Sequence, residues 1–252
     1  MNSVVVSLIA FACIFGAALL GMFLRGHLPE HHLNEDSKRV VNLGTGIIGT
    51  MAALVLGLLV ASAKANYDTQ NNELTAVAAK IILLDRGLTF YGSDTKDARH
   101  LLRRAVTSMV VQLWPSEDHS QADLERAQGN VPTDLYIKIQ GLSPQNEIQR
   151  SVKSQALAIV ADIAEKRWLM FEQQRSYVSK PLLVILVFAL AINFLSFGLF
   201  APRNVTVIVT LGLCALAMAG AIFLILELYR PFGGFIQIPS ITLRNALAQL
   251  GP

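Results

Sequence analysis

The stretch VVNLGTGIIGTMAALVLGLLVASAK, residues 40–64, decides the fold because it fits two incompatible structures. Its glycines Gly44, Gly46 and Gly49 match the G-x-G-x-x-G motif of a dinucleotide-binding turn, which needs a strand before it and further βαβ units after it. The residues after Gly49 are instead apolar on every side of a helix. In that helix Gly49, Ala53 and Gly57 form a row of small residues that lets a neighbouring helix approach closely. We therefore predict a membrane-spanning helix and no nucleotide site.

Four apolar stretches hold most of the hydrophobic residues. Of the 252 residues 53% are hydrophobic and only 15% are charged, and the mean hydropathy is +0.47. The stretches are Val4–Leu24, Leu43–Ala63, Leu182–Ala201 and Val205–Leu228. Each has the roughly 20 residues that a helix needs to cross a bilayer core about 30 Å thick. The sequence predicts an all-α protein with four transmembrane helices.

The first apolar stretch has a second interpretation, as a cleaved signal peptide. Signal peptides have a basic start and an apolar run of roughly 7–15 residues. Residues 1–3 contain no Lys or Arg, and the run that follows is longer. Both departures favour a membrane anchor.

The charges beside the apolar stretches predict the orientation of the chain. More of the nearby Lys and Arg residues fall in the middle and C-terminal segments than in the other two loops. Because basic residues collect on the cytoplasmic side, we expect both termini and the middle segment to be cytoplasmic, in the plasma (inner) membrane. The expected parts are 1–63 (transmembrane helices one and two), 64–180 (helical cytoplasmic domain), 181–228 (helices three and four) and 229–252 (C-terminal cytoplasmic segment).

The middle segment has the periodicity of a helical bundle. Lys64–Tyr91 keeps an apolar stripe without a breaker after helix two, and Asp94–Trp114 repeats apolar residues at helical spacing. Pro115–Pro132 is polar and punctuated by Gly and Pro, as loops are. Ser143–Pro144 predicts a helix start with Ser143 as the cap, and the helix is expected to break near Lys180–Pro181.

The C-terminal segment contains one further predicted helix. The residues FIQIPS, 235–240, are typical of a short extended piece. Ser240 then predicts the cap of a helix over Ile241–Leu250.

Enzyme and metal motifs are scarce. The sequence has no H-E-x-x-H, G-x-S-x-G, C-x-x-C or Walker loop. His27 and His31 in HLPEHH, 27–32, are spaced as helical metal ligands would be, but Pro29 disrupts that helix and no fourth ligand is fixed. A solvated loop is the favoured interpretation over a metal site. We expect no enzyme activity and no cofactor.

Two polar residues lie inside the apolar stretches, where burial in lipid is costly. Asn193, midway along the third stretch, is expected either to join two helices by hydrogen bonding or to line a pore. Glu227, near the end of the fourth, is expected to form an interfacial ion pair with Arg230 or Lys64, or to act in a pore.

Four basic residues share the polar side of the helix predicted over Asp94–Trp114. They are Lys96, Arg99, Arg103 and Arg104. Such a stripe is either a solvated face or, around the central axis of an oligomer, a means of concentrating anions. The sequence leaves this choice open.

The residues LYRPFGG, Leu228–Gly234, follow the fourth apolar stretch. Pro231, Phe232 and Gly233 resemble the Pro-Phe-Gly that follows the last membrane helix of bestrophin channels. The run GLLVASAKANYDTQNNELTAVAAKIILLDRGLTFYG, Gly57–Gly92, is similar to the bacterial membrane family called bestrophin-like. The layout of two spans, a helical domain and two spans agrees over nearly the whole chain.

This resemblance implies a ring-shaped homo-oligomer, pentameric in bestrophins, in which the second helix lines an ion pore with a hydrophobic neck. By helical spacing, one face of that helix could line the pore. Its residues are Asn42, Thr45, Gly49, Ala53, Leu56 and Val60. This row shares Gly49 and Ala53 with the row of small residues, so packing and pore lining compete.

Two departures from the bestrophin channels bear on function. GFIQIPS, 234–240, has no carboxylate where those channels carry a calcium-binding acidic cluster, and helix two has no aromatic residue between Leu43 and Ala63. We therefore expect no calcium gating, and a gate of Leu56 and Val60 that works by dewetting.

Taken with this resemblance, the sequence favours a passive, anion-leaning channel that conducts inorganic ions, chloride above all, among membrane lipids and without nucleic acid. The main alternative is a non-conducting membrane scaffold or sensor whose helical bundle binds a protein partner through Asp94–Leu142. A secondary transporter would need discontinuous helices and charged residues at the membrane midplane, and the spans show neither.

Overall fold

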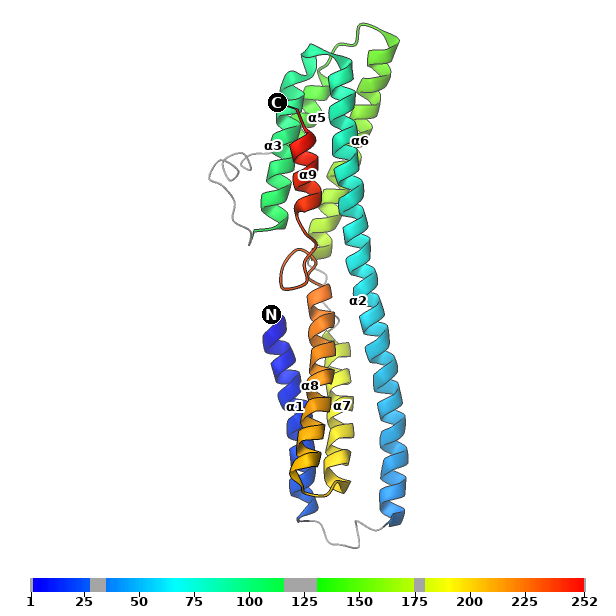
Figure 1. The fold of residues 1–252 in the computed structure, drawn as a ribbon. Helices are drawn as coiled ribbons and strands as arrows, with labels where there is room; N and C mark the ends of the chain where they lie inside the picture. The colour runs from blue at the N-terminus through cyan, green and yellow to red at the C-terminus, as the bar shows by residue number, and fades with distance from the viewer. Residues whose placement is uncertain (1, 28–34, 116–130, 175–179, 252) are drawn as a thin grey trace. The chain divides into compact units, whose positions relative to one another are not determined.

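The computed structural model describes residues 2–27, 35–115, 131–174 and 180–251, and every element within these ranges is a helix (Figure 1). The elements are α1 (Ser3–Arg25), α2 (Glu35–Tyr91), the 3-10 helix η2 (Ser93–Thr95), α3 (Lys96–Leu113), α5 (Val131–Gln140), α6 (Glu147–Gln174), α7 (Lys180–Phe200), α8 (Val205–Leu228) and α9 (Ile241–Gln249). The predicted all-α class is confirmed.

The chain divides into two compact units. Unit 1 comprises Met1–Asn66 and Tyr177–Tyr229, and unit 2 comprises Tyr67–Ser176 and Arg230–Pro252. Helix α2 contributes its first part to unit 1 and its second part to unit 2. It is unbroken to Tyr91, as the stripe after Lys64 predicts, and ends at Gly92, whose φ of 127° only glycine adopts readily.

Four helices that lie wholly or partly in unit 1 are long and apolar enough to cross a membrane. By length and composition these are Ser3–Arg25, Pro181–Phe200, Val205–Leu228 and the helix over Lys38–Tyr91, so the four predicted spans are confirmed as apolar helices. Asn2 and Asn204 cap α1 and α8, because their side chains accept hydrogen bonds from the backbone N–H groups of Val4 and Val207.

Helix α1 packs along α7 and α8 (Figure 1). Two glycines, Gly21 of α1 and Gly198 of α7, lie where the main chains of these helices meet. A Cβ added to Gly21 would lie 2.8 Å from the backbone nitrogen of Leu199 and closer still to the carbonyl oxygen of Leu195. A Cβ added to Gly198 would likewise overlap the carbonyl of Ala18. The two main chains are therefore in direct contact, an arrangement that small residues permit in membrane helices.

Two arginines join the same pair of helices at one end. Arg203, between α7 and α8, donates from Nε (3.0 Å) and Nη2 (2.7 Å) to the carbonyl oxygen of Met22, and from Nη2 to that of Phe23 (3.2 Å). Arg25, the last residue of α1, donates in return to the carbonyl oxygen of Ala201. Each guanidinium thus binds carbonyls in the last turn of a helix or just after it, where the helix dipole favours a cation. We call this pair of contacts the arginine clamp.

Unit 2 is built around one apolar core, to which α2, α3, α5, α6 and α9 contribute. The second part of α2 presents its stripe to this core, with Leu74, Ile81, Leu84 and Leu88 fully buried. Two ion pairs fasten other helices to α2. Arg99 Nε of α3 lies 2.7 Å from Asp85 Oδ1, and Lys80 Nζ lies 2.5 Å from Asp162 Oδ2 of α6.

Three local features differ from the sequence-based expectations. Helix α6 begins at Glu147 rather than after Ser143, because the side chain of Asn146 accepts the hydrogen bond from the backbone N–H of Gln149 at 2.8 Å. Ser240 precedes α9 as predicted, but its Oγ accepts from Arg244 Nε instead of capping a backbone N–H. The segment 235–240 belongs to no strand: residues 235 and 236 form bends, residues 237–239 have no regular structure and Ser240 lies in a turn.

Other predicted features lie partly outside the described residues or concern contacts between copies of the chain. Most of the predicted loop Pro115–Pro132 lies outside the described residues, and Pro132 itself belongs to α5, a helix the sequence analysis did not predict. Residues 175–179, next to the predicted break at Lys180–Pro181, are also outside them, although α7 does begin at Lys180. Within one chain Gly57 of the small-residue row has nothing within 4 Å of its Cβ position, so close packing there stays a prediction.

Substitution of Gly198 by alanine should destabilise unit 1. The added methyl group overlaps the α1 backbone, which cannot rotate away as a side chain could, so we expect a loss of at least about 1–3 kcal/mol in unfolding free energy. Thermal unfolding of the purified protein in detergent measures the effect. Gly220→Ala on α8, where a Cβ meets nothing within 4 Å, is the matched control. Equal melting temperatures for the two variants would contradict the direct backbone contact.

Candidate functional site

The predicted pore row lies along the flank of α2, between its packed and exposed sides. Thr45 is buried, and its Oγ1 donates to the carbonyl oxygen of Val41 at 2.8 Å. Asn42 and Ala53 are exposed. Gly49, Leu56 and Val60 are half-buried. In a single chain the row is therefore partly covered, and the side chains that lie fully open on α2 are another set: Leu43, Ile47, Met51, Leu54 and Leu58, which are 62–70% exposed.

Asn193 brings a polar group to the contact between α7 and α2. It is only 5% exposed, and its Nδ2 donates to the carbonyl oxygen of Ala189 at 3.0 Å. Its Oδ1 lies 3.1 Å from the Cβ position of Gly49, so Gly49 leaves room for the amide. Ser196, one turn further along α7, has a buried Oγ with no hydrogen-bond partner among the described residues. Polar atoms thus gather on one side of α7, facing α2 at Asn193.

Glu227 is buried at the end of α8, with 2% of its surface exposed. The neighbouring hydroxyl of Tyr229 lies 3.2 Å from that of Ser62 on α2. This pair joins the end of α8 to α2 within unit 1. The end of α8 is therefore a polar region of this unit.

The predicted basic stripe on α3 is divided between internal contacts and solvent. Arg99 is half-buried, and its hydrogen bonds to the Asp85 carboxylate raise the pKa of the guanidinium above its ordinary value. Arg103 donates from Nη1 to the carbonyl oxygen of Leu250 at 3.1 Å, which attaches the chain after α9 to α3. Lys96 and Arg104 are exposed. Arg99 and Arg103 therefore help to hold unit 2 together.

The Pro-Phe-Gly segment is part of the core of unit 2. Phe232 is buried and meets the ring of Trp114 edge to face, with 5.3 Å between centroids. The indole Nε1 of Trp114 donates to the carbonyl oxygen of Ile238 at 2.8 Å, and the N–H of Ile238 donates to the carbonyl of Pro231 at 2.6 Å. Gly234 has a φ of 108°, which turns the chain between these contacts. The motif forms a closed loop around an aromatic pair.

Sequence reasoning missed the residues that receive these contacts. Asp85 is an acidic residue within an apolar stripe, followed 14 positions later by Arg99, and that pattern was the available signal. Trp114 follows an amphipathic helix. No sequence pattern predicts that its indole N–H donates a hydrogen bond to the carbonyl oxygen of Ile238. Of the proposed metal ligands, His27 is exposed and lies against the Phe23 ring, while His31 is outside the described residues. Among the described residues there is no cluster suited to hold a metal ion.

These observations define a multi-pass helical membrane protein with a second, helical unit. A family model for the Bestrophin-like domain matches residues 12–243. The chain therefore belongs to the bestrophin-like family, as its resemblance predicts, and the characterised members of that family are ion channels.

Solved structures share the fold. The chain is similar to the crystal structure of a bacterial bestrophin homologue from Klebsiella pneumoniae, with a TM-score of 0.73 and 14% identity over 96% of both chains. A single-site variant of that homologue gives 0.68 and 16% identity, over 94% of this chain and 97% of the other. No curated protein sequence matches.

The aromatic pair should carry much of the stability of unit 2. Phe232→Ala removes a buried ring and leaves a cavity beside Trp114, so we expect a loss of about 3–5 kcal/mol in unfolding free energy. Phe235→Ala, three positions later, removes a ring that is exposed and should change the free energy by less than about 0.5 kcal/mol. Denaturant titration in detergent, followed by tryptophan fluorescence, separates the two. Similar losses from both variants would contradict the packing described here.

Proposed function

We propose that this protein is a passive ion channel of the plasma membrane, anion-leaning, in which the α2 helices of several copies line one pore. Membership of a family whose characterised members are ion channels is the observation that carries this proposal. The absence of charged and aromatic residues from α2 between Leu43 and Ala63 agrees with a passive, apolar constriction.

The proposed pore face is the row from Asn42 to Val60. Asn42 would provide a polar mouth, and the half-buried Leu56 and Val60 would form the narrowest ring. A ring of aliphatic side chains can close a pore by dewetting and open when it widens slightly. Since Thr45 is buried in a single chain, the exposed members of the row, Asn42 and Ala53, are the better placed to meet water.

The anion preference is proposed to come from basic residues at the cytoplasmic end. Lys96 and Arg104 are the exposed members of the stripe, whereas Arg99 and Arg103 are half-buried. Around a symmetry axis even a few cations per copy raise the local concentration of anions. We therefore expect a modest selectivity for chloride rather than a strict one.

The proposed assembly is a homo-oligomer, with five copies favoured by the resemblance to bestrophins. Residues 64–180 and 229–252, with both termini, are proposed to be cytoplasmic, on the charge pattern beside the spans. A homodimer or a monomer in the membrane would remove the ring and with it the pore. Mass measurement of the detergent-solubilised protein decides this point.

Current through the purified protein in a planar bilayer under a KCl gradient tests the proposal. Single-channel steps that reverse on the chloride side would support it. Reversal on the potassium side would retain the channel and contradict the anion preference. Silence from an intact oligomer would favour the alternative, a scaffold that binds a protein partner through residues 94–142.

Substitution of Leu56 by alanine tests the position of the constriction. A smaller side chain at the narrowest ring should raise the unitary conductance about twofold or more, because a wider apolar pore holds water more readily. Leu54→Ala is the matched control, since Leu54 lies on the open side of α2 and is 70% exposed. A larger effect at Leu54 than at Leu56 would place the pore on the other face of the helix.

A further inference from the structure

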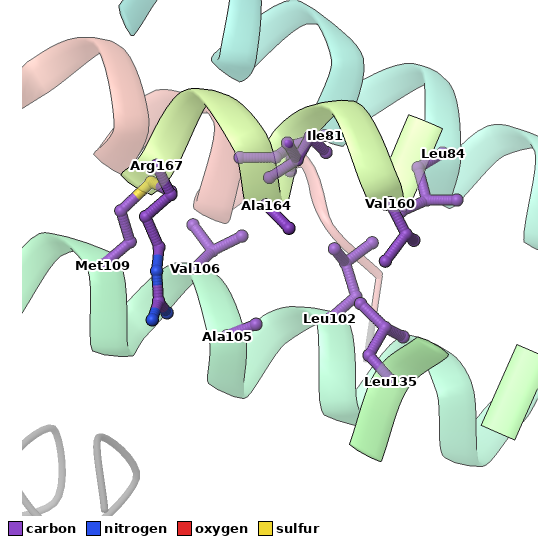
Figure 2. A pocket seen from close by; sticks show the side chains of 11 residues that line it. Ile81, Leu84, Leu102, Ala105, Val106, Met109, Leu135, Val160, Ala164 and Arg167 are labelled. Carbon is purple, nitrogen blue, oxygen red and sulfur yellow. The ribbon is translucent and has the colours of Figure 1, made fainter. Parts of the chain in front are cut away.

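Unit 2 contains a small apolar cavity and, apart from it, a hollow that an exposed cation lines. The cavity has a volume of about 40 Å³ and lies between α2, α3, α5 and α6 (Figure 2). Arg167 is the charged side chain among the described residues that line this cavity, and it already has an interaction in the structure. The cavity therefore belongs to the packed core, and the hollow is the better candidate for a binding site.

The hollow lies between the end of α3 and the turn that contains the Pro-Phe-Gly motif. Gln112 and Leu113 line it from α3, and residues 230–234 line it from the turn. Its volume of about 370 Å³ falls within the range of roughly 300–1,000 Å³ that small-molecule sites occupy. None of the described residues that line it is acidic, so Arg230 determines the sign of its charge.

The turn holds the main chain of Arg230 in a fixed position. The backbone N–H of Gly233 donates to the carbonyl oxygen of Arg230 at 3.1 Å, and the ring of Pro231 fixes the next backbone angle. The carbonyl oxygen of Pro231 accepts in turn from the N–H of Ile238 at 2.6 Å. Arg230 itself is exposed, and its guanidinium makes no ion pair or hydrogen bond with the residues that the structure describes. An unpaired cation on a rigid turn is suited to bind an anion.

The position of Arg230 along the chain indicates which anion it meets. Helix α8 is long and apolar enough to cross a membrane and ends at Leu228, so Arg230 is the second residue after the span. A residue this close to the end of a span lies at the level of the lipid headgroups, where basic pockets bind anionic lipids. The planar guanidinium matches two oxygens of a phosphate group at once.

Two other features of the hollow suit a phosphate group. The Nε2 of Gln112 donates one hydrogen bond to Ser108 Oγ at 3.1 Å, and a side-chain amide has a second N–H that can donate to a ligand. Gly233 leaves space beside the turn, because a Cβ at this position would meet nothing within 4 Å. A headgroup can therefore approach the main chain next to Arg230.

We propose that this hollow binds the headgroup of an anionic phospholipid, whose phosphate pairs with Arg230. A zwitterionic headgroup is a poorer ligand, because its ammonium group would lie near the guanidinium with no lining carboxylate to bind it. The site does not depend on ion conduction, and a protein that conducts no ions could still bind the lipid.

Native mass spectrometry of the full-length protein in detergent counts bound molecules and tests the proposal with phosphatidylglycerol, phosphatidylcholine and glycerol phosphate. Phosphatidylglycerol should bind at least about threefold more tightly than phosphatidylcholine, whose choline repels the guanidinium. Glycerol phosphate, which has the phosphate without the acyl chains, should bind at least about tenfold more weakly than phosphatidylglycerol. Equal affinities for the two lipids would overturn the proposal. Glycerol phosphate binding as tight as the lipid would do so too, since the ligand would then be a free phosphate.

Three variants assign the binding to the hollow. Arg230→Gln should weaken phosphatidylglycerol at least about tenfold and remove the preference over phosphatidylcholine. Gly233→Leu keeps the charge but fills the space beside the turn, so it should weaken the lipid as well. Arg86→Gln is the matched control, because it removes an exposed positive charge from α2 about 35 Å beyond Ala63, out of reach of the headgroups.

A thermal melt of each variant confirms folding. If Gly233→Leu unfolds, Gln112→Leu replaces it, because that change removes the second donor from an exposed position. Unchanged lipid binding in Arg230→Gln, or an equal loss in Arg230→Gln and Arg86→Gln, would overturn the proposal.

Discussion

The contact between the main chains of α1 and α7 at Gly21 and Gly198 sets the register of unit 1. No side chain separates the two helices there, so neither can slide along the other without bringing a Cβ against a carbonyl oxygen. The arginine clamp lies within one or two turns of this contact, and Asn193 precedes Gly198 on the same helix. A shift of α7 by one turn, about 5.4 Å, would separate Arg25 from Ala201 and Asn193 from Gly49. The polar groups of the membrane unit therefore depend on two glycines for their positions.

The spans could be read from the sequence because the bilayer imposes length and composition on each helix separately. The end of α8 agrees with the apolar stretch to the residue, and the continuation of α2 beyond Lys64 follows from an unbroken stripe. The glycine contact could not be found in this way, because it depends on which helix meets which. Gly49 and Gly57 looked equally suited to close packing, and only the position of Asn193 distinguishes them. The cap at Asn146 was missed for a similar reason, since Ser143 and Pro144 offered a local signal of equal quality.

In the candidate site, too, the sequence predicted the residue types but not their contact partners. The basic stripe on α3 was visible as a pattern, but its partners Asp85 and Leu250 lie on other elements, and they determine which charges remain exposed. The Pro-Phe-Gly segment was recognised by resemblance, whereas its role in this chain comes from Trp114 and Ile238. In both cases residue types were predictable and pairings were not. The pore row stays a prediction because its environment requires neighbouring copies of the chain.

The arginine clamp has a consequence for how this sequence can vary. All its acceptors are backbone carbonyl oxygens, at Met22, Phe23 and Ala201, and a carbonyl is the same whatever side chain its residue carries. Selection on the clamp therefore falls on Arg25 and Arg203 alone. Relatives that keep the clamp should hold arginine at these two positions, while the clamp itself places no demand on the side chains of the three acceptor positions. Two side chains in contact usually covary among relatives. The clamp would show no such covariation between donor and acceptor positions, although it joins two membrane helices.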